Sequence, residues 1–281
     1  MIKYTKVKVP DGALKLSPSS MNTFRRDPKE WFDGMNNKST FVGNKSTVLG
    51  TCVHYIFESE FIERTEARWW QDCCTYIDSE VMEGSISSQE GEDIKSWLPE
   101  YYTACTQWED PCKVIESEPT VCAKIDVFNG TKNDYYIAGS IDSVVVRYQN
   151  LIDDNWKYCS EEQYWEFDGS RREVYGIRDY KTSSRKNTSL KGYILQLLCY
   201  VKAYNLTHEE QITFIEVINI YKLKSGVQFN VIREDVNSKD ILMLDGYLKE
   251  MVKVHQTALK YPQLEDIIFR KGTSFTGMVL I

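Results

Sequence analysis

Val174-Tyr175-Gly176-Ile177-Arg178-Asp179-Tyr180-Lys181 begins as an apolar run typical of a β-strand and ends in closely spaced charges. A second apolar run, Ile137-Ala138-Gly139-Ser140-Ile141-Asp142-Ser143-Val144-Val145-Val146, contains one isolated carboxylate. A charge inside a strand is costly to remove from water unless a metal, an opposite charge or a hydrogen bond compensates for the loss. The two aspartates, Asp142 and Asp179, together with Lys181 therefore predict a divalent-metal site.

Strand geometry strengthens this interpretation for the second half of the motif. Asp179 and Lys181 are two residues apart, so in a strand both side chains point to the same face. The lysine ammonium would then lie beside whatever the carboxylate binds, as in sites that cleave phosphodiesters. The alternative for Asp142 is a solvated carboxylate in an edge strand or a turn. For Asp179 it is a simple ion pair with Lys181 or Arg178, and for Lys181 it is an exposed lysine at a strand end.

Further motifs surround these residues. In chain order the series is Leu16-Ser17-Pro18-Ser19-Ser20-Met21-Asn22-Thr23-Phe24, Gly50-Thr51-Cys52-Val53-His54, Glu118-Pro119, Gly139-Ser140-Ile141-Asp142, Asp179-Tyr180-Lys181 and Gln196-Leu197-Leu198-Cys199-Tyr200. This series resembles the PD-(D/E)XK nuclease superfamily, in particular its RecB-type exonuclease branch. The resemblance implies an α/β fold: a restriction-endonuclease-like core with a mixed central β-sheet flanked by helices, plus a helical insertion.

The resemblance also implies a ligand set for a magnesium or manganese ion, both of which prefer oxygen ligands. Asp142 and Asp179 would bridge the ion, with the backbone carbonyl of Tyr180 as a third oxygen ligand. His54 would add a ligand from a neighbouring helix. The alternative for His54 is a partly buried side chain whose hydrogen bonds are made within the protein.

Catalysis and DNA contact are assigned in the same way. Lys181 would position the attacking water or neutralise the developing oxyanion beside the metal, and Glu118 is the predicted upstream acid, with Glu116 as the alternative. Gln196 and Tyr200, one helical turn apart, would face the DNA backbone, although core packing is the alternative for the tyrosine. The predicted catalytic residues are Lys181, Asp179, Asp142 and Glu118, and the predicted DNA-binding residues are Gln196, Tyr200, Arg178 and Arg185.

The overall charge argues against a protein whose whole surface is positive and binds nucleic acid nonspecifically. The 281 residues carry a net charge of −7, and the isoelectric point is near 5.2. A cleft can nevertheless be basic in an acidic protein. Two clusters could line one: Arg178, Lys181, Arg185, Lys186 and Lys191 near the predicted site, and Arg25, Arg26 and Lys29 near the first motif. Ordinary solvated charges are the alternative for both clusters.

Eight cysteines in an intracellular chain are typical of reduced thiols. Many RecB-type relatives use one cysteine near the opening segment and three after the last motif to bind an iron–sulfur cluster. Here Asp27 occupies the opening position and no cysteine follows Cys199. We therefore expect no iron–sulfur cluster. The remaining cysteines considered, Cys73, Cys74, Cys105, Cys112 and Cys122, show no regular metal-ligand spacing.

The length and composition favour one domain over 1–281, which the resemblance implies is a nuclease domain. A helical cap is expected at about 66–110 and an inserted hairpin or loop at about 149–172. Helices are expected from Ser17 to the break at Asp27-Pro28, from near Thr47, and over 66–108 with an interruption at 84–88. Strands are expected at 113–125 and 135–148, followed by a loop at 182–188, a helix at 190–204, a hairpin of 214–222 with 227–233, and a helix at 236–260. A loop is expected at 33–37.

These observations predict a magnesium- or manganese-dependent DNA exonuclease that acts on single-stranded or end-containing DNA in recombination, repair or replication. A structure-specific or restriction-type endonuclease and a non-catalytic DNA-binding scaffold are the alternatives. The chain has no 18-residue apolar stretch and no apolar signal-peptide core near its start, which predicts a cytoplasmic protein without a membrane partner. A compact chain without a helicase P-loop fits a phage or mobile-element enzyme, with recombination or replication proteins as partners.

Overall fold

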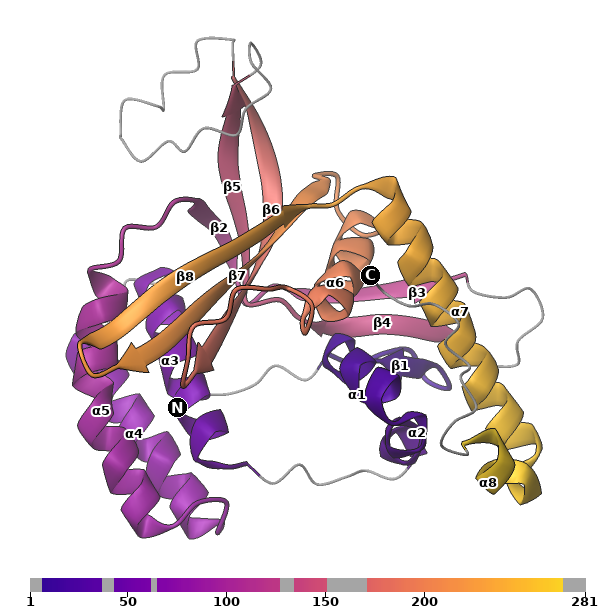
Figure 1. Ribbon diagram of the computed structural model, residues 1–281, viewed down its shortest axis with the longest axis horizontal. Coiled ribbons are helices and arrows are strands. Elements are labelled where there is room, and N and C mark those ends of the chain that lie inside the picture. The colour runs from indigo at the N-terminus through magenta and orange to yellow at the C-terminus, as the bar shows by residue number, and fades with distance from the viewer. Residues whose placement is uncertain (1–6, 37–42, 62–64, 127–133, 151–170, 270–281) are drawn as a thin grey trace.

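The strands form two sheets that meet near the centre of the molecule (Figure 1). The computed structural model describes residues 7–36, 43–61, 65–126, 134–150 and 171–269. A three-stranded sheet has the order β1-β4-β3, from Leu14–Leu16, Tyr135–Ser140 and Thr120–Ile125. A five-stranded sheet has the order β2-β5-β6-β7-β8, from Lys113–Ser117, Ser143–Asn150, Arg171–Ser183, Ile212–Leu223 and Gly226–Asp235. Because β1 runs parallel to β4 and β6 runs parallel to β7 among antiparallel neighbours, both sheets are mixed.

The division into two sheets arises because two strand-like segments are each interrupted once. The prediction of uninterrupted long strands at 113–125 and 135–148 is therefore wrong. Glu118 and Pro119 separate β2 from β3, and Asp142 lies at the break between β4 and β5. Proline lacks the N–H that a sheet ladder needs, and Glu118 has a left-handed φ of 53°. The breaks bind each other, because Glu118 N donates to Asp142 O (3.0 Å) and Ile141 N donates to Pro119 O (2.9 Å). The two acids therefore lie at the junction of the sheets and not within strands.

Strand β6 loses its pairing with β5 before it reaches Asp179 and Lys181. Its pairing with β5 ends at Ser143↔Arg178, whereas its pairing with β7 continues to Ser183↔Tyr221. Among the described residues, the segment from Asp179 to Lys181 consequently pairs with a strand on the β7 side alone. The predicted loop at 182–188 is shorter than expected, since β6 extends through Ser183.

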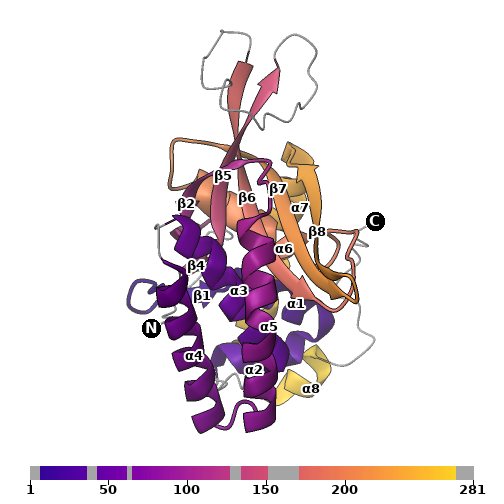
Figure 2. The same cartoon turned by 90° about the vertical axis from the view of Figure 1, so that its left-hand side faces the viewer.

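Helices cover the sheets in two groups (Figures 1 and 2). One group packs on the five-stranded sheet: α3 (Lys45–Phe61), α4 (Glu66–Met82) and α5 (Ser88–Thr106). We call these three helices the helical layer; its apolar core includes Val53 and Ile56, which pack with Tyr180. The predicted helix starts and the interruption near 84–88 are confirmed for this layer.

The second group packs around the three-stranded sheet and forms the larger core. Its members are η1 (Pro18–Ser20), α1 (Met21–Arg26), α2 (Pro28–Asn36), α6 (Ile194–Asn205), α7 (Ser238–Lys260), η3 (Pro262–Leu264) and α8 (Glu265–Ile268). The loop predicted at 33–37 is wrong for its first residues, because α2 continues to Asn36. The predicted β7–β8 hairpin and the long final helix are confirmed.

The predicted insertion at 149–172 lies largely outside the described residues. Its flanks are described: β5 and β6 pair in antiparallel fashion as far as Asn150↔Arg171. Among the described helices, none combines the length and the apolarity that a membrane span requires.

Gly176 on β6 provides a test of this packing. A Cβ added at Gly176 would lie 2.2 Å from Cε2 of Phe214 on β7, and Phe214 is fully buried. Overpacking of this kind costs about 1–3 kcal/mol, sometimes more. We expect Gly176→Ala to lower the free energy of unfolding by about 3 kcal/mol, measured by urea denaturation. Gly34→Ala, on α2 with no atom within 4 Å of the new Cβ, should instead raise it by about 0.5 kcal/mol; equal stability of both variants would contradict the packing.

Candidate metal centre

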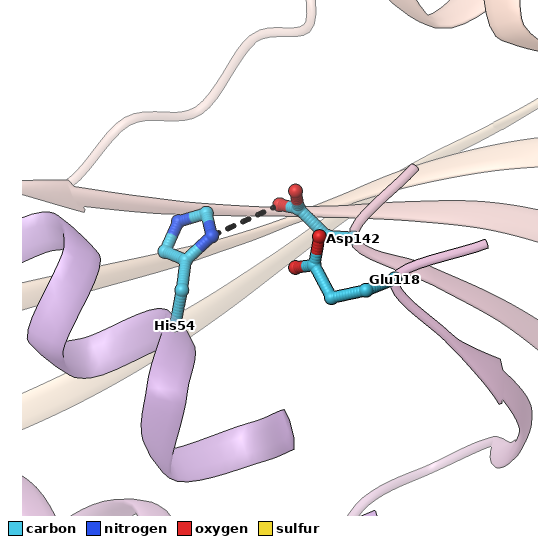
Figure 3. Close-up of side chains that lie close together, drawn as sticks. All are labelled: His54, Glu118 and Asp142. Carbon is cyan, nitrogen blue, oxygen red and sulfur yellow. Dashed lines mark ion pairs between the residues drawn. The ribbon is translucent and has the colours of Figure 1, made fainter. Parts of the chain in front are cut away.

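Three side chains converge where the two sheets meet the helical layer (Figure 3). His54 comes from α3, Glu118 from the β2–β3 break and Asp142 from the β4–β5 break. One ligand atom from each lies within 4.8 Å of the other two. Within the cluster, His54 Nδ1 lies 3.5 Å from Asp142 Oδ2. We call His54, Glu118 and Asp142 the ligand cluster.

The acidity of Glu118 is strongly perturbed. Loss of surrounding water, together with the carboxylates of Asp142, Glu58 and Asp179, raises the pKa of Glu118 to about 8. Glu118 keeps an exposed surface, so the repulsion between like charges contributes strongly to this shift. A divalent cation would relieve this repulsion. The cluster therefore has the charge and the donor set that a cation site requires.

Asp179 and Lys181 lie beside the cluster and share one face of β6, as the strand spacing predicts. Lys181 Nζ lies 2.6 Å from Asp179 Oδ2, and Gln196 Nε2 donates to Asp179 Oδ1 at 3.4 Å. The buried Oδ2 of Asp179 is thus held by the Lys181 ammonium, and Oδ1 is held by Gln196. Burial, opposed by Lys181 and reinforced by Asp142, raises the pKa of Asp179 to about 6. Asp179 is therefore a buried carboxylate whose charge is balanced by Lys181 and which interacts with the nearby charge of Asp142.

The ligand arrangement differs from the predicted one in one respect. The sequence pairs Asp142 with Asp179 as bridging ligands, whereas the structure groups Asp142 with His54 and Glu118 and places Asp179 against Lys181. Asp142 still connects the two groups, because Tyr180 N donates to Asp142 Oδ2 at 2.7 Å.

This hydrogen bond also orients the carbonyl of Tyr180. The N–H and C=O of one strand residue point toward the same neighbouring strand, so the Tyr180 carbonyl lies on the side of β6 that Asp142 occupies. The ring of Tyr180 anchors the segment from the other direction, since it stacks on Phe57 of α3 with ring centroids 4.1 Å apart. That the Tyr180 carbonyl is a metal ligand stays a prediction.

The structure separates the two candidate upstream acids. The Tyr204 hydroxyl of α6 donates to Glu116 Oε1, so Glu116 is bound outside the ligand cluster. Glu118 belongs to the cluster. Glu116 lies within β2, whereas Glu118 lies beyond its end at Ser117.

Of the four predicted DNA-binding residues, Arg178 is contradicted by its position. It is fully buried and binds two acids on the opposite face of β6, Glu216 through Nε (2.6 Å) and Asp110 through Nη2 (2.7 Å). An arginine that is sealed and doubly paired cannot reach a nucleic acid. Arg178 instead links β6 to Glu216 on β7 and to Asp110.

The other three occupy different environments. Tyr200 is buried against Gly139, where an added Cβ would lie 3.2 Å from Tyr200 Cε1, so its ring supports the site and cannot stack on a base. Gln196 is partly buried and faces Asp179. Arg185 is exposed in the segment that follows β6.

Two neighbours of the site were not identified from the sequence as functional. Glu58 lies one helical turn after His54, and burial raises the pKa of its carboxyl group; the i, i+4 spacing was its only signal. Asn219 on β7 is 1% exposed and donates from Nδ2 to Lys181 O at 3.3 Å. A lone amide within the apolar run of β7 was the signal for Asn219.

Comparisons with known proteins give a likeness in fold. No protein-family model matches the sequence, and no curated protein matches it. A crystal structure of a "putative exonuclease" from Eubacterium rectale matches 90% of this chain and 88% of its own, with a TM-score of 0.50 and 10% sequence identity. The structure of the protein SSO0001 covers 89% of this chain and 79% of its own at 13% identity, but its TM-score of 0.33 carries no argument. The first likeness shows that this chain has the α/β fold of that protein; membership of the PD-(D/E)XK superfamily stays a prediction.

Proposed function

We propose that this protein is a divalent-metal-dependent nuclease of the PD-(D/E)XK superfamily that hydrolyses phosphodiester bonds in DNA. The observation that carries the proposal is the ligand cluster of His54, Glu118 and Asp142 beside the buried Asp179–Lys181 pair. The order of the sequence motifs and the fold shared with the Eubacterium rectale protein support it.

The donor set fits magnesium or manganese. His54, Glu118 and Asp142 would hold the ion, with the Tyr180 carbonyl as a further oxygen and Asp179 at its side. A bound divalent ion supplies an activated water and neutralises charge on the phosphoryl group. The chain's own residues must then orient the water and stabilise the leaving oxygen.

Lys181 is suited to stabilising the leaving oxygen. Burial alone would lower the pKa of Lys181, but Asp179 and Asp142 outweigh this effect and raise it above its ordinary value. The ammonium group therefore stays charged, and Lys181 acts as a cation and hydrogen-bond donor toward the reacting phosphate and not as a proton acceptor. Asp179 fixes the ammonium, and Gln196 in turn orients Asp179 through the 3.4 Å hydrogen bond.

The finer proposal is an exonuclease for single-stranded or end-containing DNA, built as one domain with the helical layer as its cap. We place it in recombination, repair or replication, with no iron–sulfur cluster. A non-catalytic scaffold has no physical need to place Asp142, Asp179 and Lys181 together. A structure-specific endonuclease uses the same chemistry and differs only in needing no DNA end.

The test compares end-labelled linear single-stranded DNA with closed circular DNA of the same sequence. We expect degradation of the linear substrate with magnesium or manganese and none with excess chelator. Cleavage of the circle would establish the endonuclease alternative, and binding without cleavage under any metal would establish the scaffold. Full cleavage in chelator would refute the metal-dependent mechanism.

A further inference from the structure

We propose that Arg25, Arg185, Lys186 and Lys191 form a track that binds the backbone of single-stranded DNA and leads it to Lys181. We call these four residues the basic track. The inference rests on the proposed nuclease function and adds to it the side from which the substrate reaches the site.

The first observation is that the charges of the basic track are available. All four side chains are exposed, and within the described part of the chain none of them forms an ion pair. A cation that already binds a carboxylate must give up that contact before it can bind a phosphate. The basic track is free of this competition.

The helical layer on the other side of the site differs. Every cation that its described residues carry is paired with an acid. The pairs are Lys45–Asp93 at 2.6 Å, Lys95–Asp78 at 2.8 Å and Arg68–Asp72 at 3.4 Å. The layer also contributes the carboxylate of Glu58 near the ligand cluster. A polyanion would therefore be attracted to the basic track and not to the helical layer.

The second observation is that the segment carrying three of the four cations is held in place. The side chain of Asn219, on β7, accepts from Asn187 N at 2.6 Å and donates to Ser183 Oγ at 2.8 Å. From β8, Asn230 Nδ2 donates to Asn187 O at 2.7 Å. A segment ordered before binding loses less conformational entropy when a ligand binds. Arg185 and Lys186 are therefore presented from a fixed backbone next to the end of β6.

The third observation connects this segment to α1. Asn22 Nδ2 of α1 donates to Gly192 O at 2.6 Å, directly after Lys191. Arg25 is three residues after Asn22 and so lies on the same side of α1. The connection from β6 to α6 turns back toward α1 (Figure 1). The basic track thus extends from the strand that carries Lys181 to the first helix of the chain.

A single strand suits this arrangement better than a duplex. A duplex would bring a second phosphate backbone toward the opposite side of the site, where Glu58 and the paired helical layer lie. The net charge of −7 also disfavours the approach of a second phosphate backbone. The phosphates of one DNA strand can be bound by the basic track.

The test measures binding of a fluorescent single-stranded oligonucleotide in chelator, by anisotropy, over a range of salt concentrations. The test variant combines Arg25→Gln, Arg185→Gln, Lys186→Gln and Lys191→Gln. The control variant combines Lys45→Gln, Lys95→Gln and Lys222→Gln, which removes paired lysines, the last of them bound to Glu100 at 2.5 Å. Equal urea-unfolding midpoints for all proteins would show that each variant is folded.

Each phosphate contact to a single strand contributes about −0.7 to the slope of log K against log salt. We expect the test variant to reduce the magnitude of this slope by about 3 and to weaken binding at 0.1 M salt by about 100-fold or more, while the control variant keeps the parental slope. A parental slope in the test variant would overturn the basic track, as would a parent that binds duplex and is not displaced by single-stranded competitor.

The nuclease assay separates this failure from failure of the proposed function. A parent that cleaves DNA, with a test variant that binds as the parent does, leaves the nuclease intact and refutes only the basic track. A parent that neither binds nor cleaves DNA refutes both proposals.

Discussion

Lys181→Ala should lower the rate of DNA cleavage by about 100-fold or more, with little change in folding. The lost ammonium group lies 2.6 Å from Asp179 and carries the positive charge closest to that carboxylate. Asp179 already has its pKa raised to about 6, so it can take up a proton when its partner is removed. The variant therefore need not retain an unpaired buried charge. Single-turnover cleavage of end-labelled DNA measures the effect.

Lys222→Ala is the matched control for this experiment. It removes the same charge from a lysine that pairs with Glu100 of the helical layer, away from the ligand cluster. We expect its cleavage rate to equal that of the parent. Cleavage at the parental rate by Lys181→Ala would show that the assigned role of Lys181 is wrong, even if the fold is right.

Asp142→Asn should weaken manganese binding by about 100-fold or more and reduce cleavage at least as much, since even a residue that only supports a ligand is worth 10–100-fold. The amide oxygen can still accept the hydrogen bond from Tyr180 N, so the backbone should keep its course. Loss of one carboxylate should also lower the pKa of Glu118 from about 8 toward its ordinary value, because Asp142 is one of the charges that raise it. Isothermal titration with manganese measures the affinity.

Glu116→Gln provides the comparison for Asp142→Asn. It neutralises a nearby acid that is bound to Tyr204 and lies outside the ligand cluster. Parental manganese affinity is expected for Glu116→Gln. If Asp142→Asn bound manganese as tightly as Glu116→Gln, the ligand cluster could not be the metal site.

The parts of the fold that were predicted from sequence are those with a strong local pattern. The alternation along β6 placed Asp179 and Lys181 on one face, and their 2.6 Å contact agrees with it. The hairpin of β7 and β8 followed from two apolar strands around Gly226, whose φ of 118° requires glycine. Such features depend on neighbouring residues, which the sequence displays directly.

The division into two sheets could not be predicted in the same way. An apolar run indicates a strand but not the sheet to which each part belongs. Pro119 is a local signal of a break, but the apolar residues on both sides of it predict one longer strand. The opposite break, at Asp142, contains no proline that could signal it. Hydrogen bonds to the Glu118-Pro119 segment hold this break in place.

Pairing over long separations in the chain explains the remaining errors. The sequence shows that Arg178 and Asp179 point to opposite faces of a strand, but not that Asp110 and Glu216 meet Arg178 there. Likewise, Glu116 and Glu118 are equivalent by composition until Tyr204 is known to bind the first. These partners come from distant segments that only the folded chain brings together.

The most direct test of the metal site is the anomalous scattering of crystals soaked in manganese. We predict one strong anomalous peak, from a manganese ion bound by His54, Glu118, Asp142 and the Tyr180 carbonyl at metal–ligand distances of roughly 2 Å. No peak at these residues, or a peak bound elsewhere while the ligand cluster stays empty, would contradict the account.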